Sequence, residues 1–399
     1  MDPPRGGSRV LMNVPAKATH RQTRQYNRRL VLRTLYDFGP VSRAEVARVT
    51  GLTRTTVSDV VAGLIADGMA SEVGRGPSSG GKAPILVSVV DDARHVIGLD
   101  LGESAFVGAL VNLRGEVRRI VELPVEGHDG DEAVALVYRL VDELLEDAGE
   151  SLLGIGVGTP GVIDTTAGII RWAVNLDWQD LPLGGLLQQR YDVPVNVAND
   201  SQAAALAEYT FGGDASRRPN LVAIKVGRGI GAGIVLNGAL YQGDGFGAGE
   251  IGHVVVEDDG AACRCGRFGC LETVASGPAI VARARELGLD ARTIDDVRLA
   301  LLAGDEAAIA AARFAGRYLG RAIASLVGAL DIHEVVVHGP VAALGITWLT
   351  AVRDEAVRRS LPLLADSVEI RPARIAANEV VLGASALLMT RELGLSLVR

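Results

Sequence analysis

The sequence has few cysteines, few aromatic residues and no long apolar run. It contains three cysteines in 399 residues, and Phe, Trp and Tyr together make up 4%. A membrane-spanning helix needs about 20 consecutive apolar residues, and because no segment provides them we expect no membrane partner. Asp2 and Arg5 are not followed by the apolar core of a secretory signal peptide. We therefore expect a cytoplasmic protein, whose thiols stay reduced.

The overall composition is typical of a well-cored α/β protein, and its charge is unevenly distributed. Hydrophobic residues make up 48% and the mean hydropathy is +0.24, and the length is sufficient for two or three domains. Residues 1–90 contain 13 Lys or Arg and 6 Asp or Glu, a net charge of +7, whereas the remainder carries −15. A basic front segment suggests a polyanionic partner, although a solvated basic surface would show the same charge.

All three cysteines lie within eight positions, which indicates that they act together. Cys263, Cys265 and Cys270 follow His253 with the spacing H-x9-C-x-C-x4-C. A set of three thiolates and one imidazole is a standard ligand set for structural Zn²⁺. The sequence therefore predicts a zinc site formed by these four residues.

Two other interpretations of the cysteines remain. They could be small buried core residues, but the string C-R-C-G-R-F-G-C is polar and glycine-rich for a core element. They could form a disulfide, but Cys263 and Cys265 are too close to pair comfortably and the odd count leaves one thiol over. Glu250 and Glu272 flank the cluster, and their carboxylates could accept hydrogen bonds from the adjacent hydroxyls of a polyol.

The front segment has the pattern of a helix-turn-helix. Hydrophobic spacing and capping residues predict helices over 22–38, 43–49 and 54–67, with Ser42 and Thr53 as N-caps of the second and third. The exposed start of the third helix is the part of a recognition helix that reaches base edges. The residues there are Arg54, Thr55, Thr56 and Ser58.

Two strands follow these helices, so we expect a winged helix-turn-helix. The strands are predicted over 69–73 and 84–90, joined by a hairpin tip that carries Arg75 and Lys82. These cations would contact phosphates rather than bases. A small protein-interaction domain is the alternative, but the basic tip, the positive charge and the string G-L-T-R-T-T-V-S favour DNA.

From residue 95 the chain alternates strands and helices twice, which suggests a duplicated α/β core with a cleft between its halves. Long helices are predicted over 131–147, 307–330 and 379–391, with a strand over 334–338.

In four strings, residues 91–399 resemble the ROK family of repressors and sugar kinases. The strings are G-E-I-G-H, C-L-E, A-N-D and G-I-G-A-G-I-V-L-N-G-A-L. The resemblance implies a two-lobed, actin-like ATPase fold of the α/β class with a structural zinc loop. The winged helix-turn-helix resembles that of the family's repressor branch. We expect a disordered tail over 1–20 and three further parts. These are a DNA-binding domain over 21–90, lobe 1 over 91–219 with the C-terminal helix 379–399, and lobe 2 over 220–378 containing the zinc loop 249–273.

The resemblance also implies roles for individual residues. Asp200 in A-N-D is similar to the catalytic base of the kinases, with ATP and Mg²⁺ as cofactors if that activity is retained; as an alternative or additional role it could be the N-cap of a helix over 201–211. The expected sugar contacts are Gly161, Asn199, Asp200, Glu250, His253 and Glu272.

Three positions depart from the kinase pattern on the nucleotide side. The kinases carry D-x-G-G-T in the first turn, where this chain has Glu103 in D-L-G-E-S. Arg228 replaces the threonine of G-T-G-I-G. The adenine-side strand of the kinases ends in Gly-Gly, whereas this chain has H-G-P, His338 to Pro340. A carboxylate near a phosphate is unfavourable in a closed cleft. These departures favour a protein that has kept the sugar receptor and lost the kinase.

Two functions therefore compete. The favoured one is a sugar-responsive DNA-binding transcription regulator, expected to be a repressor that binds operator DNA as a homodimer or homotetramer. The other is an ATP-dependent, glucokinase-like sugar kinase with an added DNA-binding domain. Both activities in one chain would also be compatible with the sequence.

Overall fold

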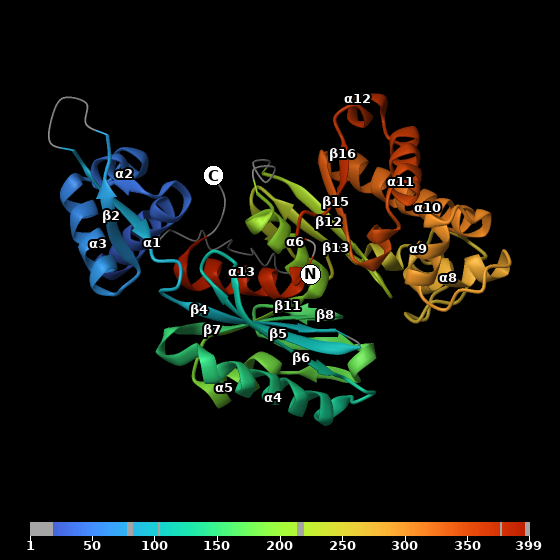
Figure 1. The fold of residues 1–399 in the computed structure, drawn as a ribbon, viewed down its shortest axis with the longest axis horizontal. Helices are drawn as coiled ribbons and strands as arrows, with labels where there is room; N and C mark the ends of the chain where they lie inside the picture. The colour runs from blue at the N-terminus through green and yellow to red at the C-terminus, as the bar shows by residue number, and fades with distance from the viewer. Residues whose placement is uncertain (1–18, 78–82, 103, 214–218, 376, 396–399) are drawn as a thin grey trace, which may run out of the picture. The chain divides into compact units, whose positions relative to one another are not determined.

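The chain divides into two compact units, Met1–Val89 and Val90–Arg399 (Figure 1). The computed structural model describes residues 19–77, 83–102, 104–213, 219–375 and 377–395. The predicted disordered tail over 1–20 falls outside these residues except for its last two positions, and so do Lys82 and Glu103.

The first unit contains the three helices that the sequence predicts, with their ends within three residues of the expected positions. They are α1 His20–Phe38, α2 Arg43–Thr50 and α3 Arg54–Ala66. Ser42 accepts a hydrogen bond from the backbone N–H of Glu45, and Thr53 accepts one from Thr56, so both predicted N-caps are confirmed. Gly51 ends α2 with a φ of 70°, a left-handed conformation that favours glycine.

A three-stranded sheet completes the first unit as a winged helix-turn-helix. The strands are β1 Val41–Ser42, β2 Ala70–Arg75 and β3 Ile85–Val89, in the order β1-β3-β2. The helices bury a common apolar core that includes Val31, Leu35, Val57, Val61 and Leu64, all fully buried. The start of α3 remains outside this core.

The second unit contains two five-stranded sheets with the same topology. The first has the order β11-β7-β4-β5-β6 and the second the order β14-β13-β12-β15-β16. In each, the central strand (β4 or β12) pairs antiparallel with the next strand in sequence and parallel with a later one. The strands of the first sheet are β4 His95–Leu101, β5 Ala105–Asn112, β6 Val117–Pro124, β7 Leu152–Thr159 and β11 Val195–Asn199. Those of the second are β12 Leu221–Val226, β13 Ile230–Leu236, β14 Ala239–Tyr241, β15 Glu334–His338 and β16 Glu369–Pro372.

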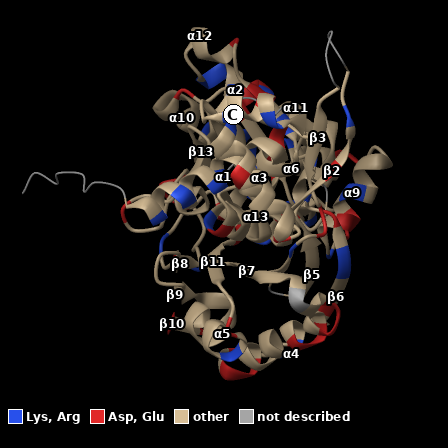
Figure 2. Cartoon of the chain, turned by 90° about the vertical axis from the view of Figure 1, so that its left-hand side faces the viewer, with Lys and Arg blue, Asp and Glu red and all other residues tan. Residues whose placement is uncertain are grey.

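This repetition confirms the predicted two-lobed, duplicated core. We call the part built on the first sheet lobe 1 and the part built on the second lobe 2. Helices α4 Gly130–Ala148 and α5 Leu183–Tyr191 cover one face of the first sheet, and α13 Glu379–Leu393 covers the other (Figure 1). The acidic residues of α4 lie toward its two ends and are red in Figure 2, whereas the stretch between them is free of acidic residues. A small sheet of β8 Val162–Asp164, β9 Ile169–Ala173 and β10 Trp178–Leu181 extends lobe 1.

Helix α6, Asp200–Phe211, joins the two lobes because it packs against both α13 and the second sheet. The contact with α13 is close: a Cβ added to Gly383 would lie 1.7 Å from the carbonyl oxygen of Ala203. Only glycine permits this approach of the two helices. Six helices complete lobe 2: α7 Glu272–Ala275, α8 Gly277–Glu286, α9 Ile294–Leu302, α10 Glu306–Leu330, α11 Ile346–Arg359 and α12 Pro362–Ala365. The longest of them, α10, packs along α11 and also contacts α7, α8 and α9.

The part of the chain that the structure describes contains no helix that is both long and apolar enough to cross a membrane.

Candidate functional site

A cleft of about 450 Å³ opens between the loops of the two lobes. Its walls include Gly102 and Ser104 after β4, and the loop Gly227–Gly231 after β12. All six residues that the sequence analysis proposed as sugar contacts line this one cleft: Gly161, Asn199, Asp200, Glu250, His253 and Glu272. They come from four separate segments of the chain, which the fold brings together at one place.

Asn199 and Gly161 form the lobe 1 side of the cleft. The side-chain oxygen of Asn199 accepts hydrogen bonds from the backbone N–H groups of Ser201 (2.9 Å) and Gln202 (3.2 Å), and its amide donates to the carbonyl of Gly161 (3.0 Å). Asn199 is thus the N-cap of α6, and the alternative that gave this role to Asp200 is wrong by one residue. Gly161 has a φ of 105°, and a Cβ there would lie 2.1 Å from the carbonyl of Trp172.

Because Asn199 caps the helix, the side chain of Asp200 is available to pair with Lys225, a residue that the sequence pattern did not indicate. The Nζ atom of Lys225 donates to Oδ2 of Asp200 at 2.7 Å, while Oδ1 accepts from the backbone N–H of Ser201 at 2.7 Å. Burial alone would raise the pKa of Asp200, but the charge and hydrogen bond of Lys225 outweigh it, so the pKa lies below its usual value. The one sequence signal for Lys225 is that it is the only charged residue of strand β12.

Two further carboxylates face this ion pair. Asp100 lies near the end of β4, and burial raises its pKa to about 6 even though the charge of Lys225 opposes the shift. Glu379 begins α13 and lies 3.7 Å from Nδ1 of the buried His338. Burial would raise the pKa of Glu379, but its interaction with His338 lowers it overall. The end of the cleft around Lys225 is therefore surrounded by three carboxylates, those of Asp100, Asp200 and Glu379.

Asp100 should make the folding stability pH-dependent. Its pKa is raised from 3.8 to about 6, so the folded state binds the proton more tightly than the unfolded state, and this contribution to stability is lost as the pH rises through 6. Between pH 5 and 7 we expect the wild type to lose about 1 kcal/mol more stability than Asp100→Asn. Urea unfolding of both proteins across this pH range measures the difference. Parallel pH profiles would show that Asp100 does not titrate there.

On the lobe 2 side, Glu250 and Glu272 bring two carboxylates to the cleft. Burial, together with the charges of Asp200 and Glu272, raises the pKa of Glu250 to about 7. Glu272 begins α7, and its Oε2 accepts a hydrogen bond from the backbone N–H of Ile230 at 3.1 Å. This bond fixes the carboxylate against the glycine loop Gly227–Gly231.

Arg264, between the first two cysteines, reaches across the mouth of the cleft. Its guanidinium donates to Oδ1 of Asn175 in lobe 1 at 3.1 Å and lies 3.5 Å from Oε1 of Glu272 in lobe 2. The cysteine loop is thus connected both to a cleft carboxylate and to the opposite lobe. No sequence pattern indicates this contact, because Arg264 and Asn175 are 89 residues apart in the chain.

The predicted metal ligands form one cluster. The ligand atoms of His253, Cys263, Cys265 and Cys270 all lie within 4.8 Å of one another. Nδ1 of His253 is 3.6 Å from Sγ of Cys263, and Sγ of Cys265 is 3.7 Å from Sγ of Cys270. Tetrahedral bonds of about 2.3 Å place ligand atoms about 3.8 Å apart, so the four residues fit a tetrahedral metal ion.

His253 connects this cluster to the cleft. Its Nδ1 faces the cysteines, whereas its Nε2 lies 3.9 Å from Oε2 of Glu250. One ring can therefore serve a metal ion on one side and a cleft ligand on the other. Of the positions that depart from the kinase pattern, Arg228 and Pro340 line the cleft, His338 is buried behind it, and Glu103 lies outside the described residues.

In the first unit, the residues predicted to contact DNA lie at the start of α3 and on the wing. Arg54, Thr55 and Ser58 are exposed. Thr56 is half-buried, and its hydroxyl lies 2.9 Å from that of Thr53. Arg75 is the last residue of β2 and is exposed.

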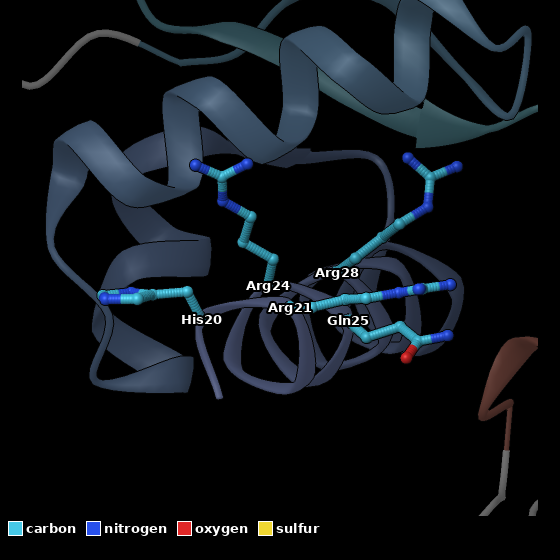
Figure 3. Close-up of a pocket in the computed structure, with 5 residues that line it drawn as sticks. All are labelled: His20, Arg21, Arg24, Gln25 and Arg28. Atoms are coloured by element: carbon cyan, nitrogen blue, oxygen red, sulfur yellow. The ribbon is translucent and has the colours of Figure 1, made fainter. Parts of the chain in front are cut away.

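A second basic surface lies on α1. A hollow of about 690 Å³ is lined by His20, Arg21, Arg24, Gln25 and Arg28 (Figure 3). The side chains of Arg24 and Arg28 extend to the same side of the helix in Figure 3. Arg28 pairs with Asp67 at 2.7 Å, and the first turn of α1 contains no acidic residue. Three of the 13 basic residues of positions 1–90 lie on this surface.

Comparison with known proteins connects both units to transcription regulators. The chain is 30% identical to a xylose repressor of Caldicellulosiruptor bescii over 389 residues, which cover 93% of this chain and 97% of the repressor. Its structure matches that of a ROK family transcriptional regulator, a homologue of the E. coli Mlc protein, with a TM-score of 0.83 at 26% identity, over 94% of this chain and 98% of the regulator.

A kinase matches only part of the chain. A glucokinase of Halalkalibacterium halodurans is 36% identical over 75% of this chain, although the match spans 96% of the glucokinase. The remaining quarter of this chain therefore has no counterpart in that enzyme. The family model of the ROK family matches residues 96–391, almost the whole second unit. With this match and the full-length similarity to the xylose repressor, the chain belongs to the ROK family.

Proposed function

We propose that this protein is a sugar-responsive DNA-binding transcription regulator that acts as a repressor. The observation that carries the proposal is that regulators, unlike the glucokinase, match the chain across both units. We assign DNA binding to residues 21–90, and sugar binding to lobe 1 (91–219 with 379–399) together with lobe 2 (220–378). In this scheme operator DNA and a small sugar are its two ligands, and the regulator acts as a homodimer or homotetramer.

The chemistry of the cleft supports a polyol ligand. Asn199 offers an amide, and Asp200, Glu250 and Glu272 offer carboxylates that can accept hydrogen bonds from adjacent hydroxyls. Gly161 lines the cleft beside Asn199, packed against the backbone of Trp172, and His253 supplies Nε2. The sugar thereby contacts both lobes at once, so its binding favours one cleft geometry over others.

We assign the metal of the cysteine cluster as structural Zn²⁺. Four protein ligands close a tetrahedral site and leave no position for substrate, which is typical of structural zinc. The ion would hold the loop that presents Glu250, Arg264 and Glu272 to the cleft. It supplies rigidity and takes no part in a reaction.

The DNA response follows from a change in population. If sugar stabilises one arrangement of the lobes, the linked DNA-binding units of a dimer no longer match two half-sites one helical turn apart. A mobility-shift assay with the DNA upstream of the protein's own coding region, with and without D-xylose, D-glucose and N-acetyl-D-glucosamine, tests the proposal. We expect one of the sugars to release the complex. Absence of DNA binding at low salt with or without sugar would refute it.

Substitutions in the recognition helix α3 and in the wing should affect DNA binding in different ways. Arg54→Ala should weaken operator binding by about 1–3 kcal/mol and affect scrambled DNA little, because a base contact is lost. Arg75→Ala should weaken binding to both DNAs alike and lower the slope of log K against log salt by about one, because one fewer counterion is released. Salt-dependent titrations of each variant on both DNAs measure this. Equal losses on both DNAs for both variants would remove the base-reading role of α3.

A sugar kinase with an added DNA-binding domain is the second candidate. The observation that favours it is the 36% identity to a glucokinase across three quarters of the chain, together with Asp200 at the cleft. A coupled assay of ADP release with ATP, Mg²⁺ and the same sugars distinguishes the two. Turnover that disappears in Asp200→Asn would establish the kinase.

A further inference from the structure

Lys225 is an unusual residue for its position. It lies in β12, whose other five residues are apolar, and its side chain is only 23% exposed. A lysine in such a place is stable only when its charge is compensated. Hydrogen bonding to Asp200 at 2.7 Å provides part of that compensation.

The negative charge that compensates Lys225 comes from three elements, each of which brings one carboxylate close to it. We call the three residues the carboxylate cluster: Asp100 near the end of β4, Asp200 at the start of α6 and Glu379 at the start of α13. Burial alone would lower the pKa of Lys225, but the charges of this cluster keep it above the usual value. One ammonium group therefore lies among three carboxylates.

The carboxylate cluster has a feature typical of a cation site. The Oδ1 atom of Asp100 is buried and has no hydrogen-bond partner among the described residues. An unpaired buried carboxylate oxygen is costly unless a nearby cation compensates it. Carboxylate oxygens are also the ligands that Mg²⁺ takes from proteins, which bind it through one or two carboxylates and leave its other positions to water or phosphate.

The duplication of the fold shows where the compensating charge comes from. Asp100 is the penultimate residue of the central strand of the first sheet, and Lys225 is the penultimate residue of the central strand of the second. Each is followed two positions later by a glycine that lines the cleft, Gly102 or Gly227. Equivalent positions of the two lobes thus carry opposite charges that face the same end of the cleft.

We propose that Lys225 is a built-in cation that takes the place of a divalent metal ion at the carboxylate cluster, so that the cleft binds sugar without phosphoryl transfer. This assignment rests on the proposed function as a sugar receptor. It names Lys225 as the residue that prevents phosphoryl transfer. With its ammonium on Oδ2 of Asp200, and Ser201 on Oδ1, the carboxylate is held as a hydrogen-bond acceptor for a sugar hydroxyl. A carboxylate stabilised in this way is a weak proton acceptor, so it does not serve as a general base.

Manganese titration of zinc-loaded protein tests the assignment directly, with electron paramagnetic resonance reporting free Mn²⁺. Wild type and Lys225→Arg should bind no Mn²⁺ at the cluster in the millimolar range. Lys225→Met should bind one Mn²⁺ per chain, with an affinity at least tenfold higher than that of the wild type. The double variant Lys225→Met/Asp200→Asn should lose this binding again. Lys225→Gln, which keeps a hydrogen-bond donor for Asp200 without the charge, replaces Lys225→Met if that variant does not fold.

Two results would overturn the assignment. One is Mn²⁺ binding by the wild type that Asp100→Asn abolishes, because the cluster would then accept a metal beside the lysine. The other is a failure of both neutral variants to gain Mn²⁺. The titration does not require a sugar, so it decides the role of Lys225 independently. Loss of sugar response in every protein, measured by thermal shift on the same samples, would instead contradict the proposed function.

Discussion

Cys265→Ser is expected to lose the bound metal ion and, with it, the sugar response. Its sulfur is one of four ligand atoms within 4.8 Å of one another, and hydroxyl is a poor substitute for thiolate. The cysteine loop has little regular structure besides isolated bridges such as Val255 to Cys270. Binding of zinc at a structural site contributes on the order of 10 kcal/mol to the folding free energy of such a segment. Metal content should fall from one ion to less than about 0.1 per chain, and sugar affinity at least tenfold.

The loop offers a matched control for this experiment. Phe268 lies between Cys265 and Cys270, is 62% exposed and does not line the cleft. Phe268→Ser should therefore keep both metal and sugar binding. Metal analysis and calorimetric titration with the releasing sugar measure the two effects separately. A Cys265→Ser protein that retains the metal would refute the ligand set. One that loses the metal but binds sugar normally would show that the loop does not support the cleft.

Features that depend on near neighbours in the chain could be predicted from the sequence. Ser42 and Thr53 cap helices that begin at the next residue, and the cysteine spacing closes within one loop. These contacts need only local geometry. The same holds for the alternation of strands and helices, which predicted the duplicated core.

Contacts between distant segments were not predictable in the same way. The sequence could identify Asp200, but its partner Lys225 lies 25 residues away and becomes a neighbour only when β12 and α6 pack together. The error at the start of α6 has a related cause. Asn199, Asp200 and Ser201 can all cap a helix, and the choice depends on how far strand β11 extends. Because β11 runs through Asn199, Asp200 becomes the first helical residue and faces the lysine.

A buried ion cluster behind the cleft should have the largest effect on stability. Arg371 on β16 donates to Oε1 of Glu208 at 2.6 Å and to Oε1 of Glu334 at 2.6 Å, and each of the three residues is at most 8% exposed. Glu208 belongs to α6, eight residues after Asp200, and its other oxygen accepts from the backbone N–H groups of Arg374 and Ile375. The cluster therefore holds α6 against the second sheet.

Removal of the arginine would leave two buried carboxylates side by side. We expect Arg371→Met to lower the free energy of unfolding by about 3–5 kcal/mol, because breaking a buried pair leaves an uncompensated charge. Arg139→Met is the matched control, since Arg139 forms an exposed pair with Glu143 at 3.2 Å and should contribute less than about 0.5 kcal/mol. Urea unfolding measures both. Because Glu208 and Asp200 share one helix, Arg371→Met should also weaken sugar binding, whereas Arg139→Met should not. A variant as stable as the control would mean that α6 is held in place by its packing on α13 instead.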